Sequence, residues 1–97
     1  MEKTQFLDAK KLRMLDVFLR KKPSLALIFL NNSKRKVYIS ALAKKVDCTY
    51  SHIVKLLQKM EKMGLVNLSK NGRTKTITLT KKGKEIAELM EKVIFLF

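Results

Sequence analysis

The apolar positions of this 97-residue chain recur mostly at helical spacings, most clearly in the segment CTYSHIVKLLQKMEKMGLV, residues 48–66. Intervals of three and four predict one buried helix face, formed by Ile53, Leu56, Leu57, Met60 and Met63. The opposite face carries Ser51, Lys55, Gln58 and Lys62, with His52 and Lys59 on its flank. Glu61 is the only acid in the segment, whereas a solvated helix usually mixes both signs on its outer face. The pattern therefore indicates that this outer face has a role beyond solvation.

Two further helices are predicted near the beginning of the chain. Residues 8–20 carry a loose apolar stripe, made by Leu12, Leu15 and Leu19. The stripe favours a helix but leaves an extended conformation open. Pro23 then suits the first turn of a second helix over residues 23–32, because its missing N–H costs nothing there. This second segment is apolar nearly all round, so we expect it at the centre of the core, with a buried strand as the alternative.

Two helices joined by a tight turn are predicted next. Residues 37–39 are long enough only for one small strand or an extended connection. A short helix over residues 41–46 follows, with Ser40 as its N-cap. Its buried residues are expected to be Leu42, Ala43 and Val46. After the turn, Thr49 is expected to cap the longer helix over residues 50–63.

A β-hairpin is predicted after the longer helix. Gly64 stands where a left-handed residue closes a helix. Residues 65–69 and 74–79 alternate as strands, and residues 70–73 form the turn between them. The Asn-Gly pair in that turn is the strongest short-range hairpin signal. The side chains expected to point inward from the second strand are Ile77 and Leu79.

A final helix is predicted over residues 81–97, with Thr80 as its cap. Its apolar stripe consists of Ile86, Leu89, Met90, Val93, Ile94 and Phe97. Phe95 and Leu96 make this end nearly continuously apolar. A surface of this kind is too apolar to be left in water, so we expect it to dock on another surface.

The chain carries a large excess of positive charge, with 22 Lys and Arg residues against eight Asp and Glu residues. Residues 17–84 hold 17 of the bases and only two of the acids, so this part has a net charge of +15 and the two ends together have −1. A lysine-rich, heat-adapted surface is one interpretation, but thermal adaptation enriches Glu along with Lys. A polyanion, most commonly nucleic acid, is the better-fitting partner.

The order of these elements is that of a helix-turn-helix followed by a two-stranded wing with a basic tip. The sequence resembles the winged helix-turn-helix of MarR-type transcriptional regulators and of similar small archaeal and bacterial DNA-binding proteins. The resemblance covers about residues 23–90 and is carried by YISALAKKVDCTYSHIVKLLQKMEKMGLV, by NGR and by ITLTKKGKEI. It implies a mainly α fold with a small β-hairpin and flanking N- and C-terminal helices.

The length fits a single winged helix domain over residues 1–97, with its core at residues 23–80. The flanking segments 1–22 and 81–97 are expected to form a homodimer, because the apolar helix ending in IFLF needs a partner. MarR-type chains are usually longer than this one, with more helix at both ends for dimerisation.

A helix lying in the major groove of duplex DNA would use its lysines on phosphates and short polar groups near its start on base edges. The wing would contact the DNA backbone beside that groove, and Arg73 would be able to enter a minor groove. The residues expected to contact DNA are Lys44, Lys45, Thr49, Tyr50, Ser51, His52, Lys55, Lys59, Lys70, Asn71, Arg73 and Lys75. The basic loop at residues 34–36 adds further candidates for phosphate contacts.

Several of these residues have a plainer interpretation. Tyr50 lies near the apolar side of its helix, so packing is as good an explanation as DNA contact. His52 fits a surface role unrelated to DNA, and Asn71 and Gly72 are explained by turn geometry alone. Cys48 directly precedes a helix, so a redox switch is one interpretation, but a small core hydrophobe is the better one.

The composition argues against an enzyme. One His, one Cys and sparse acids supply neither a metal shell nor a nucleophile with its base, and no glycine-rich phosphate loop is present. We therefore expect no cofactor and no metal. The longest apolar run, residues 25–30, is far too short to span a bilayer. The chain begins without a signal-peptide pattern and holds a single Cys, so a cytoplasmic location is expected.

The function expected from the sequence is that of a transcriptional regulator whose homodimer binds a palindromic duplex site. Two alternatives stay open. One is a sequence-tolerant architectural protein of the chromatin type, and the other is a winged helix that contacts proteins. Steep salt dependence with little sequence preference would indicate the first, and negligible binding to random duplex DNA would indicate the second.

Overall fold

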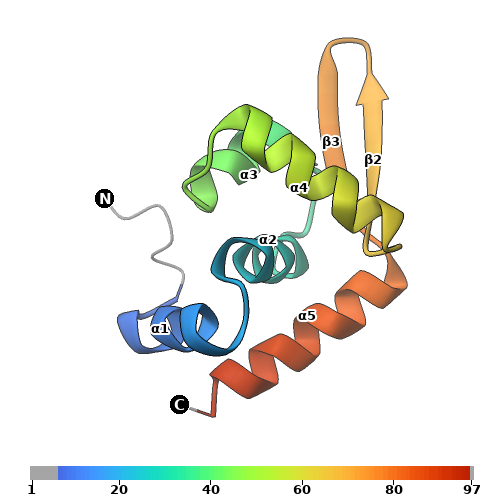
Figure 1. Ribbon diagram of the computed structural model, residues 1–97. Coiled ribbons are helices and arrows are strands. Elements are labelled where there is room, and N and C mark those ends of the chain that lie inside the picture. Colours follow the sequence, from blue (N-terminus) through green and yellow to red (C-terminus); the bar gives the residue numbers. More distant parts are fainter. Residues whose placement is uncertain (1–6, 97) are drawn as a thin grey trace.

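A computed structural model describes residues 7–96 of the chain, apart from the side chains at positions 14–16 and 18. Its elements are α1 (Ala9–Phe18), α2 (Lys21–Asn31), β1 (Val37–Tyr38), α3 (Ile39–Lys45), α4 (Tyr50–Lys62), β2 (Val66–Asn71), β3 (Thr74–Leu79) and α5 (Lys81–Ile94). The predicted fold class, mainly helical with a small sheet, is confirmed (Figure 1). The first two segments are helices, so the extended and strand alternatives for them are wrong. The side chain of Leu15 and the residue Phe97, both assigned to apolar stripes, lie outside the described residues.

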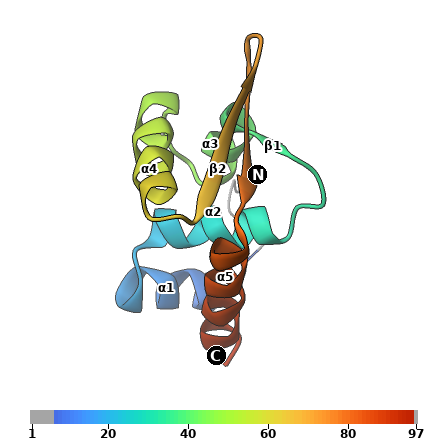
Figure 2. The same ribbon diagram turned by 90° about the vertical axis from the view of Figure 1, so that its right-hand side faces the viewer.

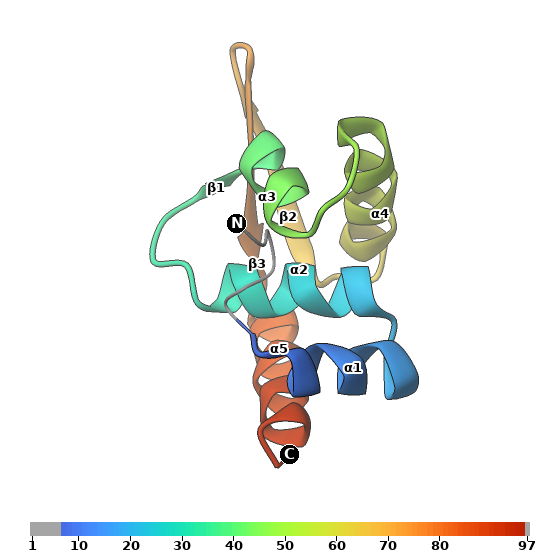
Figure 3. The same ribbon diagram turned by 90° about the vertical axis from the view of Figure 1, so that its left-hand side faces the viewer.

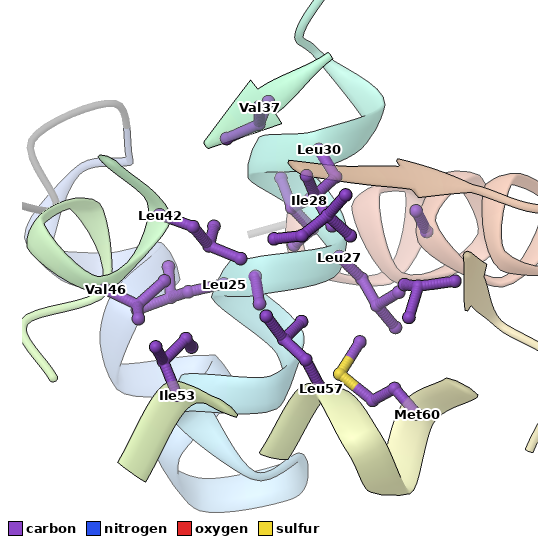
Figure 4. Packing of buried hydrophobic residues seen from close by; sticks show 14 of the residues in the cluster. Leu25, Leu27, Ile28, Leu30, Val37, Leu42, Val46, Ile53, Leu57 and Met60 are labelled. Carbon is purple, nitrogen blue, oxygen red and sulfur yellow. The ribbon is translucent and has the colours of Figure 1, made fainter. Parts of the chain in front are cut away.

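Helix α2 lies at the centre of the molecule and packs against α1, α3, α5 and β3 (Figures 1 and 3). Nearly every residue in its second and third turns is buried, namely Ser24, Leu25, Ala26, Leu27, Ile28 and Leu30. Figure 4 shows Ile53, Leu57 and Met60 of α4 directed toward this helix. Fully burying one such side chain contributes about 1.5–3 kcal/mol. The continuous apolar character of α2 is thus explained by its having neighbours on several sides.

The sheet has three antiparallel strands in the order β1-β3-β2. The turn of the hairpin differs from the predicted one, because Asn71 still pairs with Thr74 and ends β2. The turn is therefore the two-residue loop Gly72–Arg73, and Gly72 at its first position has φ of +66°. This is the position of a type II′ turn that requires Gly.

The turn between α3 and α4 is closed by Asp47, which takes the left-handed φ of 57°. The backbone N–H of Cys48 donates to the carbonyl of Ala43 over 2.8 Å, so carbonyls at the end of α3 are satisfied as in a Schellman motif. Lys22 Nζ donates to the Asp47 carbonyl over 2.9 Å and ties the start of α2 to this turn. Cys48 is half-buried against the core, as expected of a small hydrophobe.

The end of α4 is closed by Gly64, and the predicted left-handed conformation is confirmed by its φ of +77°. Leu65 N–H donates to the Met60 carbonyl over 2.9 Å, which completes a second Schellman motif. Helix α4 therefore ends at Lys62, and Met63 is its C-cap with 63% of its surface exposed. The placement of Met63 on the buried face was wrong, because the helix stops before that residue can pack.

The start of α5 is fastened to the end of α4 by Thr80. Its hydroxyl donates to the Gly64 carbonyl over 2.6 Å and accepts from the Gly83 N–H over 3.0 Å, so the predicted cap is confirmed. Gly83 lies so close to the backbone of Leu65 that an added Cβ would stand 2.0 Å from the Leu65 carbonyl oxygen. Thr80 and Gly83 thus fix the base of the wing to α5.

Two other sequence predictions are corrected by the structure. Ser40 is not an N-cap, because β1 leads directly into α3 and the helix begins at Ile39, with Tyr38 at the cap position and no side-chain hydrogen bond. In α5, Leu89 and Val93 are 60% and 46% exposed, although both were assigned to the buried stripe. The residues of α5 that are buried are Gly83, Ala87 and Ile94.

Helix α1 contacts both α2 and α5, so the termini of the described chain lie together (Figure 1). Asp8 accepts the Lys11 N–H over 2.9 Å at the start of α1, and this bond is the main reason why the pKa of Asp8 lies below its ordinary value. The ammonium group of Lys11 also stands 4.8 Å from the centre of the Phe95 ring. Among the described helices, none has the length and apolar character needed to cross a membrane.

We expect Gly83→Ala to destabilise the fold by about 2–3 kcal/mol in urea denaturation, since the new methyl group overlaps the Leu65 carbonyl. In an ordinary helix the same change stabilises by about 1 kcal/mol, so the sign of the effect is diagnostic. Glu85→Ala, an exposed position in the same helix, is the control and should stay within about 0.5 kcal/mol of the parent chain. A stabilised Gly83→Ala variant would contradict the close contact.

Candidate nucleic-acid interface

The outer face of α4 is uncovered by the described part of the chain. Its exposed side chains are Ser51, His52, Lys55, Gln58, Lys59 and Lys62. The opposite face is buried through Ile53, Leu57 and Met60, with Leu56 half-buried. Thr49 Oγ1 accepts the His52 N–H over 3.2 Å, so the predicted cap is confirmed and fixes the first turn of the helix. The amphipathic division predicted for this helix is therefore present, with its polar side open.

Glu61, the only acid of α4, is engaged with the wing. Its Oε2 accepts the Leu68 N–H over 3.1 Å. Strand β2 is an edge strand, and an edge strand leaves N–H groups without partners in the sheet. The carboxylate thus satisfies an edge N–H, and it joins the last turns of α4 to the base of the wing.

The wing extends as a narrow blade past the start of α4 (Figures 1 and 2). All four of its predicted site residues are exposed at or near the tip, namely Lys70, Asn71, Arg73 and Lys75. No acid occurs between residues 66 and 79, which are the two strands and their turn. The blade therefore presents only positive charge.

A cleft of about 360 Å³ lies between the wing and the first residues of α3 and α4. Its lining residues are Tyr38, Ile39, Ser40, Tyr50, Arg73, Thr74 and Lys75. Tyr50 is 46% exposed and lies in this cleft, which favours an interface role over burial in the core. Arg73 and Lys75 face it from the wing, so the cleft joins the start of α4 to the wing in one positively charged surface.

Tyr38, Ser40 and Thr74 also belong to this surface, although they were not among the predicted site residues. Tyr38 is 56% exposed, and it reaches the wing because it pairs with Thr76 across β1 and β3. An exposed aromatic residue within a short apolar strand was the available signal. The pairing partner of that strand was not predictable from local pattern.

His52 lines a second hollow, of about 640 Å³, between α4 and the junction of α1 with α2. The other lining residues are Val17, Leu19, Arg20, Lys21, Lys22, Pro23 and Leu56. None of the residues of this junction was among the predicted site residues. Arg20, Lys21 and Lys22 of this junction line the hollow together with His52. Lys22 also donates a hydrogen bond to the Asp47 carbonyl.

Lys44 and Lys45 do not line either hollow. Both are exposed in the last turn of α3, and the ammonium group of Lys45 stands 5.7 Å from the centre of the Phe29 ring on α2. This cation–π contact directs the Lys45 side chain toward α2. The structure therefore brings Tyr50, Arg73 and Lys75 together at the cleft and places His52 at the second hollow, whereas the other eight predicted site residues are exposed and line neither.

Metal binding finds no support in the side chains that the structure describes. Within residues 7–96, no group of three or more His, Cys, Asp or Glu side chains gathers where a metal ion could be held.

The profile of the winged helix DNA-binding domain family matches residues 10–83, about three quarters of the chain. The chain therefore belongs to the winged helix DNA-binding domain family, as the sequence predicted. A protein of Archaeoglobus fulgidus is 38% identical over 58 residues, a match that spans 60% of this chain and 61% of that relative.

Solved structures share the same fold. The crystal structure of AF1382 from Archaeoglobus fulgidus superposes with a TM-score of 0.82 at 28% identity, covering 86% of this chain and 94% of that one. MepR of Staphylococcus aureus, a MarR-family regulator, superposes with a TM-score of 0.72 at 19% identity, covering 96% and 68%. MepR in its complex with DNA gives 0.69 at 24% identity, covering 88% and 69%. The predicted resemblance to MarR-type proteins is confirmed at the level of the fold.

We expect Glu61→Ala to release the base of the wing, so that hydrogen exchange of the Leu68 amide accelerates and stability falls by about 1 kcal/mol. Glu61→Gln keeps an acceptor oxygen at the same place and should protect the amide nearly as well. Gln58→Ala, exposed on the same helix, is the control and should leave the Leu68 amide unchanged. Equal exchange rates in the Ala and Gln variants at position 61 would contradict the assigned bond.

Proposed function

We propose that this protein is a transcriptional regulator that acts as a homodimer on a palindromic duplex site. In this proposal α4 is the recognition helix in the major groove, and the wing holds the flanking backbone. The observation that carries it is the continuous, acid-poor surface formed by the open face of α4, the cleft and the wing. Membership in the winged helix DNA-binding domain family supports duplex DNA as the partner.

Affinity in this proposal comes from phosphate contacts. Lys55 and Lys59 extend along the open face of α4, and Lys70, Arg73 and Lys75 project from the wing. Each cation that neutralises a phosphate releases bound counterions, so binding weakens as salt rises. Among the described residues these five form no ion pair, which leaves their charges available to the duplex.

Specificity in this proposal comes from the first turn of α4. Ser51 and His52 are short polar side chains on the open face, at the end of the helix nearest the wing tip. Their hydroxyl and imidazole groups suit hydrogen bonds to base edges, which differ among base pairs in the major groove. Tyr50 and Arg73 line the cleft beside Ser51 and His52, where they would contact the DNA backbone that runs between α4 and the wing.

The relatives of known role agree with this proposal. MepR is described as a transcription regulator of the Staphylococcus aureus multidrug efflux pump MepA, and one of its structures is a complex with DNA. The superposition with that complex covers 88% of this chain and 69% of the MepR chain. We infer the same mode of DNA binding here.

The dimer in this proposal forms through α5 and the segment after it. Leu89, Val93 and Leu96 follow one another at intervals of four and three, and they are 60%, 46% and 82% exposed. We propose that a second copy of the chain covers this apolar face. Glu88 and Lys92 flank the face, so in a two-fold contact Glu88 of each copy would lie opposite Lys92 of the other. Two-fold pairing would also present two recognition helices to two half-sites.

An architectural, sequence-tolerant DNA-binding protein is the second candidate. It is favoured by the spread of positive charge over residues 17–84, which exceeds what α4 and the wing alone contain. Little preference among sequences at physiological salt would decide for it.

For DNA binding, we expect Arg73→Ala to weaken the complexes of all duplexes alike, by about three- to tenfold, and to lower the salt slope by about one. Ser51→Ala and His52→Ala should instead change the ranking of sequences in a selection from random duplexes. Lys10→Ala removes one positive charge at an exposed position of α1, so it serves as the control for the loss of charge alone. Equal losses on every sequence for all three site variants would contradict this division of roles.

For assembly, we expect light scattering of the parent chain to give twice the 11.2 kDa chain mass. Leu89→Glu with Val93→Glu should give the mass of a single chain with the fold intact by circular dichroism, because a desolvated pair of carboxylates opposes association. Val17→Glu, an exposed apolar position on α1, tests whether that helix takes part. A parent chain that runs at 11.2 kDa at high concentration would refute the dimer.

A further inference from the structure

A second positively charged surface lies away from α4. Four cations line a hollow of about 380 Å³ at the connection between α2 and β1, namely Lys34, Arg35, Lys36 and Lys84. The remaining lining residues are Leu30, Asn31, Ser33, Ile77, Thr78 and Leu79, so no carboxylate of the described residues lines the hollow. We call this the rear basic surface.

The rear basic surface and the open face of α4 lie on opposite sides of the sheet. The connection between α2 and β1 projects on one side of the wing and α4 stands on the other, as Figures 2 and 3 show from two directions. The strand order β1-β3-β2 agrees, because the connection leads into β1 at one edge whereas α4 packs against β2 at the other. A single straight duplex on α4 would therefore not reach the rear basic surface.

The four rear cations are not neutralised by the described part of the chain. Lys34, Arg35, Lys36 and Lys84 are all exposed and form no ion pair with a carboxylate of residues 7–96. Three of them follow one another in a short connection, where like charges repel and turn geometry does not require them. Their arrangement around one hollow is better explained by a polyanion that fills it.

We propose that the rear basic surface binds the phosphate backbone of a second duplex, so that the protein holds two DNA segments at once. The first duplex lies on α4 and the wing, and in this respect the inference rests on the proposed function. Flexible lysine and arginine side chains recognise phosphates without reading bases, so the second duplex is bound with little sequence preference. Bridging of this kind serves DNA looping or compaction and goes beyond binding of one site.

Bridging is tested with two duplexes, one fixed to beads and one fluorescent in solution. We expect the parent chain to retain the fluorescent duplex on the beads at 50–100 mM salt, within the range in which such contacts persist, roughly below 200 mM. Arg35→Glu with Lys36→Glu should lower the retained fluorescence at least tenfold. The same variant should bind a single duplex in solution within about twofold of the parent chain.

The matched control is Lys10→Glu with Arg13→Glu, which also reverses one Lys and one Arg at exposed positions but on α1. It should bridge as the parent chain does. Undiminished bridging by the rear variant would overturn the inference, since a dimer holding one duplex on each α4 would give that result. An equal loss of single-duplex binding would overturn it as well, because the rear cations would then contact the first duplex.

The same assay separates the two proposals. A parent chain that binds single duplexes but does not bridge them refutes the rear surface and leaves the proposed regulator intact. A parent chain that binds no duplex refutes the proposed function itself.

Discussion

The structure depends on one constraint, which is that α4 buries one face against the core while its opposite face stays uncovered. Ile53 and Leu57 are fully buried, and Figure 4 shows them directed toward α2 and α3. Both ends of the helix are fixed, by the Thr49 cap at the start and by the left-handed Gly64 at the end. A helix held in this way cannot rotate without exposing core residues, so its lysine side keeps a fixed direction relative to the wing.

Three acids of the described residues, Asp8, Glu61 and Glu91, accept hydrogen bonds that stabilise the fold. Glu61 accepts an edge N–H of β2, and Glu91 accepts the side-chain amide of Asn31 over 3.0 Å, which joins α2 to α5. Asp8 stands at the start of α1, on the side of the molecule away from the wing. Of the 17 bases in residues 17–84, nine lie on α4, the wing and the α2–β1 connection, and all nine are exposed to solvent.

Much of this architecture was predictable because its signals are local. The three-and-four spacing within α4, the threonine caps and the glycine after α4 each act over a few residues, and the structure bears all of them out. The predictions that were wrong concern features that depend on contacts between residues far apart in the sequence. Ser40 lost its predicted cap because β1 pairs with β3, and Leu89 is exposed because α5 turns the face that carries Gly83, Ala87 and Ile94 toward the core. The cleft joining Tyr38, Tyr50 and Arg73 depends on sheet pairing, so no local pattern could reveal it.

The central claim, that duplex DNA lies on the open face of α4, is tested most directly by following backbone amide signals in NMR during titration with a duplex. The chain mass of 11.2 kDa is well suited to this measurement. The account predicts that the largest shifts occur in residues 50–62 and 70–75, with small shifts in the buried residues of α2. Saturable binding that leaves the amides of α4 unshifted would contradict it.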